Sequence, residues 1–154
     1  MSVNDYEINC STLLVMPDES NGMTKILEID DEIVARKKCL KIIDNSCRFF
    51  GSSLEGRQEG TKSLLDVAVK APIIVEESKN IIFFPTVSPR EAKCMWVSFN
   101  NLLKYTKLDK RNSKLYFEGG KEIIISVSYN IIDNQVTRCI KLEKVLFDRK
   151  KMVN

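Results

Sequence analysis

A glycine-bearing segment near the middle of the chain comes close to the phosphate-binding loop of nucleotide hydrolases. It reads Gly51-Ser-Ser-Leu-Glu-Gly56-Arg57-Gln58, whereas the loop pattern is G-x-x-x-x-G-K-[ST]. Arg57 stands where a lysine reaches between phosphates, and Gln58 replaces the hydroxyl that binds magnesium. A helix is predicted before the segment, whereas a true phosphate-binding loop follows a strand. We therefore expect no nucleotide hydrolysis at this segment.

The same segment suits an anion in a simpler way, either as a sharply turning loop or as a short capped helix. Ser52 and Ser53 are favoured N-cap residues, and the backbone N–H groups that follow such a cap can hold a phosphate. The residues expected to contact a DNA phosphate here are Arg48, Ser52, Ser53, Arg57 and Lys62. The equally weighted alternative is a capped helix with solvated arginines.

Basic residues mixed with aromatic residues form a second candidate site after residue 89. The basic residues are Arg90, Lys93, Lys104, Lys107, Lys110, Arg111 and Lys114, and the aromatic residues are Trp96, Phe99, Tyr105 and Tyr116. Such mixtures are common in nucleic-acid-binding surfaces, although strand spacing favours core positions for most of these aromatic residues. We expect DNA contacts from Arg90, Lys93, Lys104, Lys107 and Lys110, and from Arg138 further along the chain. No helix-turn-helix, zinc-finger or RNP motif accompanies them.

The chain has no histidine, which removes the commonest general base and the commonest metal ligand. Its five cysteines are scattered, without a C-x-x-C pair, and predict neither a zinc site nor a redox dithiol. Cys39 and Cys47 lie eight residues apart, which favours two buried thiols on one helix face. We therefore expect no enzyme, no metal and no cofactor.

Charge is distributed unevenly along the 154 residues. Residues 1–89 contain 10 Lys and Arg against 14 Asp and Glu, whereas residues 90–154 contain 14 against 7. A basic second half suggests a polyanionic partner, and the alternative is a surface that the charges merely keep solvated. The change of sign coincides with Pro85–Pro89, so we expect one domain over 1–154, either undivided or with two lobes, 1–89 and 90–154.

The hydrophobic pattern predicts an α+β fold of mostly antiparallel strands with a mid-chain helix and a C-terminal amphipathic helix. A hairpin is expected around Asn21-Gly22, and the mid-chain helix is expected to begin near Lys37 and to stop at Gly51. Further strands are expected at 64–69, 72–75, 81–84 and 95–99, then one or two helical turns at 100–105 and a second hairpin over 114–126. The last helix is expected from about Ile131 onward.

Neither a membrane span nor a secretion signal is indicated by the sequence. No segment approaches the ~20 apolar residues of a span, and the first ten residues contain two acids and no base. We therefore expect a cytoplasmic protein.

Short motifs spread over nearly the whole chain match the signature of one known family. The strongest match is Ser46-Cys-Arg-Phe-Phe-Gly-Ser-Ser53, followed by Gly56-Arg57 and Gly60-Thr61. Later matches in the same order are Pro72-Ile73, Phe84-Pro-Thr86, Cys94 with Trp96 and Ser98, Ser128-Tyr-Asn130, Asn134-Gln-Val136 with Arg138, and Asp148-Arg149.

In these motifs the chain resembles the competence transcription factor family, ComK. The resemblance implies an activator of natural competence in Gram-positive bacteria. Such proteins bind double-stranded DNA at paired AT-rich boxes upstream of DNA-uptake genes, largely from the minor groove, as dimers that assemble toward tetramers. Members usually continue past the final helix with a tail that an adaptor recognises for a Clp protease. Because the sequence given ends at Asn154, the adaptor and the protease stay open as partners. The rival hypothesis from the residues alone is a protein–protein adaptor module whose basic half docks an acidic partner, and a nucleotide-binding enzyme is a distant third.

Overall fold

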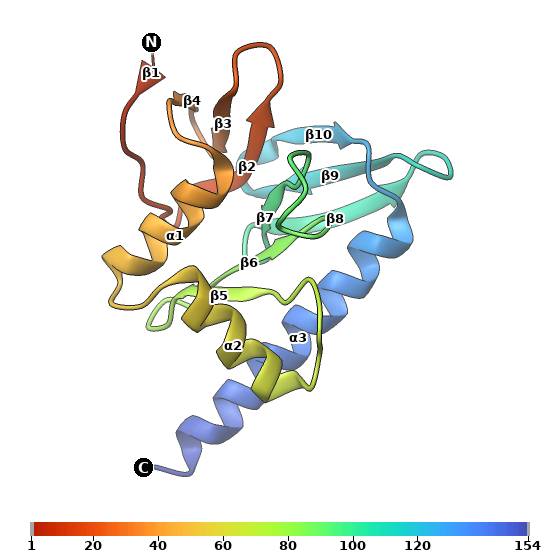
Figure 1. Cartoon of the computed structure of the whole chain (residues 1–154). Coiled ribbons are helices and arrows are strands. Elements are labelled where there is room, and N and C mark those ends of the chain that lie inside the picture. Colours follow the sequence, from red (N-terminus) through yellow and green to blue (C-terminus); the bar gives the residue numbers. More distant parts are fainter. Residues whose placement is uncertain (1, 154) are drawn as a thin grey trace.

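The computed structural model describes residues 2–153, and these residues form two β-sheets and three α-helices (Figure 1). Nearly all neighbouring strands are antiparallel, a helical region lies in mid-chain, and a long helix ends the chain. The predicted α+β class is confirmed, although the mid-chain region holds two helices instead of one.

The larger sheet has seven strands in the order β1-β4-β3-β2-β7-β6-β5, and only the β1–β4 pair is parallel. Its strands are β1 (Ser2–Val3), β2 (Thr12–Asp18), β3 (Met23–Glu28), β4 (Glu32–Ala35), β5 (Ile73–Glu76), β6 (Ile81–Pro85) and β7 (Trp96–Ser98). The hairpin expected at Asn21-Gly22 joins β2 to β3, and Gly22 supplies the positive φ of 68° that the turn needs. Strands from both sides of Pro89 share this sheet, because β7 lies between β2 and β6.

The smaller sheet has three strands in the order β10-β9-β8. They are β8 (Leu102–Lys107), β9 (Ser113–Phe117) and β10 (Glu122–Ile125), with a short 3-10 turn, Glu118–Gly120, before β10. The helical turn predicted over 100–105 is therefore wrong, whereas the hairpin over 114–126 is confirmed. A register shift between Leu102 and Lys104 explains the error: the successive residues Leu103 and Lys104 are both exposed, and Tyr105 and Thr106 after them are both partly buried, so strict alternation is lost.

The two mid-chain helices are α1 (Cys39–Phe49) and α2 (Leu54–Leu65). Gly51, with a φ of 89°, turns the chain between them, and Ser53 Oγ caps α2 by accepting a hydrogen bond of 3.0 Å from the amide of Gly56. Of the two alternatives for the glycine segment, the capped helix is therefore the one observed. The strand predicted at 64–69 is wrong, because Leu64 and Leu65 form the last turn of α2 and pack into the core.

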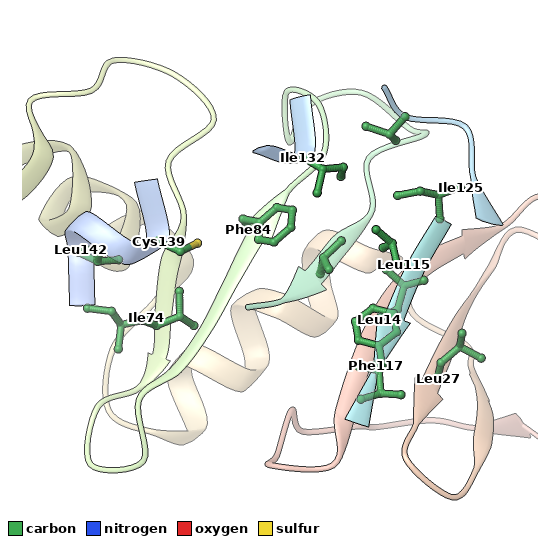
Figure 2. Close-up of a cluster of buried hydrophobic side chains, with 14 residues drawn as sticks. Leu14, Leu27, Ile74, Phe84, Leu115, Phe117, Ile125, Ile132, Cys139 and Leu142 are labelled. Atoms are coloured by element: carbon green, nitrogen blue, oxygen red, sulfur yellow. The ribbon is translucent and has the colours of Figure 1, made fainter. Parts of the chain in front are cut away.

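The core lies on both faces of the large sheet. On one face, α1 packs Ile42, Ile43 and Cys47 against Phe83 and Trp96. On the other face, the small sheet and α3 (Tyr129–Lys151) cover side chains such as Leu14 and Phe84, and Figure 2 shows Leu115, Phe117 and Ile125 of the small sheet there, with Ile132, Cys139 and Leu142 of α3. The small sheet and α3 therefore form one outer layer, and α1 forms the other. Among the described residues, no helix is both long and apolar enough to cross a membrane.

Candidate nucleic-acid interface

A groove of about 550 Å³ separates the β8–β9 hairpin from the loop that joins β6 to β7. Lys110 and Arg111 line it from the hairpin, and Lys93 lines it from the loop. Its apolar lining comes mainly from the end of β10 and the start of α3, and Glu19 is its acidic member. Cations from two segments about 17 residues apart in sequence thus meet across one concave surface, an arrangement that suits a polyanion.

The hairpin wall of the groove is held by Asp109. Its Oδ1 accepts hydrogen bonds from the amides of Arg111 at 2.8 Å and Asn112 at 2.9 Å, and from the Asn112 side chain at 3.0 Å. These hydrogen bonds, led by that of the Asn112 side chain, lower the pKa of the Asp109 carboxyl below its usual value. Asp109 is therefore engaged with its own turn, while Lys110 and Arg111 are exposed.

The opposite wall is the loop over residues 86–95, whose two ends are tied together. Thr86 N donates to Met95 O at 2.9 Å, and Met95 N donates to Thr86 Oγ1 at 3.0 Å. The loop therefore leaves the sheet as a closed unit and carries Arg90 and Lys93 exposed. Lys93 lies 3.7 Å from Glu91, an exposed pair that water screens strongly.

A second groove, of about 590 Å³, adjoins the first on the other side of the same loop. Arg90 and Lys93 line it from the loop, and Lys38 lines it from the start of α1, together with the acidic residues Asp18, Glu19 and Glu91. Lys93 thus belongs to both grooves. Lys38 was not among the expected contacts, although the run Arg36-Lys-Lys38 was available in the sequence as a signal.

The remaining cations of the small sheet lie around this region. Lys107 ends β8 and is exposed next to the hairpin tip. Lys104 and Lys114 lie over the ring of Tyr116, with Nζ 5.0 Å and 5.2 Å from its centroid. Lys114 also pairs with Glu122 at 2.7 Å, so part of its charge is neutralised.

Comparison with known proteins decides the family. The model of the ComK protein family matches residues 3–151. The chain belongs to the ComK family. A curated relative, the competence transcription factor of Bacillus subtilis (strain 168), is 36% identical over 149 residues, which are 96% of this chain and 78% of that protein. No solved structure matches significantly.

Membership of the ComK family places the chain among transcription factors and not among enzymes. Among the described residues, no group of three or more acidic or cysteine side chains is arranged to hold a metal ion.

The residues expected around the α1–α2 junction lie apart from the grooves. They belong to α1, which covers the opposite face of the large sheet, and to α2, which lies along the β5 edge between α1 and α3, whereas the grooves lie beside the β8–β9 hairpin. Arg48 is paired with Asp44 at 2.8 Å, and Ser53 is used as the cap of α2. Ser52 is half-buried, and Lys62 lies 3.9 Å from Glu59. The structure thus brings the two groups of predicted residues to different surfaces.

Arg57 differs from the exposed loop arginine that its neighbouring glycines suggest. It lies in the first turns of α2 and is half-buried, and its Nε is buried without a hydrogen-bond partner among the described residues. Burial raises the pKa of the Cys47 thiol to about 11, and the positive charge of Arg57 lowers that pKa in part. Arg57 therefore has a partly internal environment.

Arg138 contacts backbone of this chain. Its Nη1 donates hydrogen bonds to Val69 O at 2.7 Å and Lys70 O at 3.2 Å. The buried Gln135 adds hydrogen bonds from its Nε2 to Lys70 O at 2.9 Å and Pro85 O at 2.7 Å. These two side chains hold the irregular segment after α2 against α3.

Proposed function

We propose that this ComK-family chain is a sequence-specific DNA-binding activator of competence genes, which acts in the cytoplasm on paired AT-rich promoter boxes. The observation that carries the proposal is the meeting of Arg90, Lys93, Lys110 and Arg111 around the two adjoining grooves in a chain of a transcription factor family. Lys107 extends this set at the end of β8. We name these five residues the basic rim.

The charge of the surrounding layer supports the same surface. Residues 102–151, which form the small sheet and α3, contain twelve basic and six acidic residues. The exposed side chains of Lys141, Lys144, Arg149 and Lys150 continue the basic surface along α3. Such a layer attracts a phosphate backbone over a distance comparable to the Debye length.

Minor-groove binding fits the side chains of the basic rim. Lysine and arginine are donors only, and the minor groove of A·T pairs presents only acceptors. An AT-rich minor groove is also narrow and strongly negative, which favours inserted arginine and lysine. Specificity for AT-rich boxes then arises from groove shape together with these contacts.

Self-association as a dimer or tetramer is part of the proposal, because paired boxes require paired subunits. On α3, Ile140 and Phe147 are 54% and 61% exposed and lie seven residues apart, on one side of the helix. This apolar pair is our candidate for the contact between subunits.

The test is a gel-shift titration with an AT-box duplex and a GC-rich control duplex. The double variant Lys107→Glu, Lys110→Glu is expected to lose at least tenfold in affinity, whereas the control Lys41→Glu, Lys79→Glu, exposed and outside the basic rim, keeps the wild-type value. The logarithm of the association constant is expected to fall with log[salt] with a slope of about −4 or steeper, since each phosphate contact contributes about −0.9. Equal losses from both double variants would contradict the assigned surface, and a flat salt plot would favour a protein–protein adaptor.

A further inference from the structure

The tip of the β8–β9 hairpin combines a rigid turn, three cations and one uncovered apolar side chain. Leu108 is 47% exposed, and Lys107, Lys110 and Arg111 lie within three residues of it. Figure 1 shows the hairpin reaching the outer edge of the molecule, away from both chain ends. An exposed leucine alone has no functional meaning, but this combination is the one that proteins use to enter a DNA groove.

The turn is fixed before any partner binds. The amides of Leu108 and Asp109 both donate to Asn112 O, at 3.1 Å and 3.4 Å. Asp109, the acidic residue of the tip, directs its carboxylate to the amides of the turn, as described above. The tip therefore presents donors and an apolar side chain in a set geometry, and its carboxylate is already satisfied.

We propose that this hairpin tip inserts into the minor groove of DNA, with Leu108 as an apolar wedge between base pairs. The proposal rests on the proposed function and names the element that reads the DNA. Lys107, Lys110 and Arg111 contact the groove and its flanking phosphates. One DNA strand then follows the groove between the hairpin and the 86–95 loop, where Lys93 faces Lys110 and Arg111.

An apolar wedge also supplies a preference for AT-rich DNA. Inserting a side chain unstacks two base pairs and bends the duplex, which costs a few kcal/mol. Pyrimidine–purine steps such as TA unstack and kink most easily, so the wedge favours boxes that contain them without a hydrogen bond to any base. This physical route adds to the donor–acceptor match of the basic rim.

The experiment compares Leu108→Ala with Leu103→Ala, a matched control within β8 that is 61% exposed but lies away from the tip. Duplexes with fluorophores at both ends report bending by energy transfer, and titrations give affinities for an AT box and for a GC-rich duplex. Leu108→Ala is expected to lose about tenfold in affinity for the AT box, to bend it less than half as much, and to keep the wild-type salt slope. Leu108→Met is expected to restore both bending and affinity.

The outcomes separate this inference from the proposed function. If the wild-type chain binds neither duplex, the proposed function itself fails. If the wild type binds and Leu108→Ala binds and bends the AT box equally well, the wedge is wrong and the DNA-binding function stands. An equal loss in Leu103→Ala would also overturn the wedge, because the face of the small sheet would then make the contact.

Discussion

The hydroxyl of Tyr105 donates a hydrogen bond of 2.7 Å to the carboxylate of Asp133, and this contact joins β8 to the first turns of α3. The ring of Tyr105 also lies 5.3 Å from that of Tyr129. Burial and the Asp133 carboxylate raise the pKa of Tyr105, so its hydroxyl keeps the proton that it donates. The contact fixes the hairpin relative to the helix behind it.

Tyr105→Phe is therefore expected to lower the free energy of unfolding by about 1 kcal/mol, because Asp133 loses its donor while the ring is kept. Urea unfolding measures this loss. Tyr129→Phe is the control, since its hydroxyl makes no hydrogen bond to another part of the described chain, and it is expected to unfold like the wild type. Equal stability of the Tyr105 variant would show that solvent replaces the donor fully.

Arg138→Ala is expected to affect stability more than DNA binding, although the sequence predicted a DNA contact for this residue. Its hydrogen bonds to Val69 O and Lys70 O hold the segment after α2, and their loss is expected to cost about 1–2 kcal/mol. Thermal or urea unfolding together with AT-box affinity separates the two roles. Lys141→Ala, which changes an exposed neighbour on α3, serves as the control. If Arg138→Ala melts like the wild type but loses tenfold in AT-box affinity, Arg138 contacts DNA and is not a structural residue.

Asp44 gives the stability of the α1–α2 junction a defined pH dependence. Burial alone would raise the pKa of its carboxyl, but hydrogen bonds from the Leu54 amide at 2.9 Å and from Arg48 lower it overall. A lowered folded-state pKa stabilises the protein above the unfolded value of about 3.9, and the contribution disappears as pH falls through the folded value. Asp44→Ala is expected to cost about 1–2 kcal/mol near pH 7, with a gap to wild type that narrows below about pH 4.

The control for Asp44 is Arg48→Ala. The Arg48 side chain is 63% exposed, so its pair contributes little, and the Leu54 contact survives its removal. Urea unfolding at several pH values checks both variants. A gap for Asp44→Ala that stays constant down to pH 3 would contradict the assignment of the pKa.

Thiol labelling is expected to distinguish Cys10 from the other four cysteines. Cys10 is exposed, whereas Cys47, Cys94 and Cys139 are buried and burial raises the pKa of each of these three thiols. Burial also raises the pKa of the half-buried Cys39 to about 11. One thiol per chain should therefore react rapidly with a disulfide reagent at neutral pH, and the other four only after unfolding. Cys10→Ser should abolish the fast phase, and rapid labelling of a second thiol would show that one of the covered sites opens.

The elements with strong local signals were predictable from the sequence. Asn21-Gly22 marks a hairpin turn by its own conformational preference, and α1 and α3 each carry a stripe of apolar residues at helical spacing. The errors occur where tertiary packing outweighs local pattern. Leu64 and Leu65 resemble a strand but end a helix that begins at the Ser53 cap. β8 resembles a helical turn because its bulge leaves Leu103 and Lys104 both exposed and so interrupts the alternation typical of a strand.

The sequence indicated which basic residues could contact DNA, but it did not indicate which of them lie together in the structure. Lys93 and Lys110 were expected to contact DNA, and the structure lines one groove with both of them. Arg48 and Arg57 were also expected to contact DNA, yet α1 covers the opposite face of the large sheet and α2 lies along its β5 edge, away from the grooves. Which cations face one another depends on the order of the strands, and neither charge nor spacing along the chain contains that order. The role of every residue in DNA binding stays a prediction.

The central position of β7 has a consequence for the synthesis of the protein on the ribosome. β2 pairs with β3 and β6 pairs with β5, but the other edge of each strand stays open until residues 96–98 emerge, because β7 is the strand that pairs with both edges. After the β2–β3 hairpin is complete at Glu28, about seventy further residues are translated before β7 is available, which takes several seconds at roughly 5–20 residues per second. A nascent chain that stalls in this interval presents the open edge of β2, and after β6 is made it presents a second one. Open strand edges are the feature through which chains aggregate and that chaperones cover.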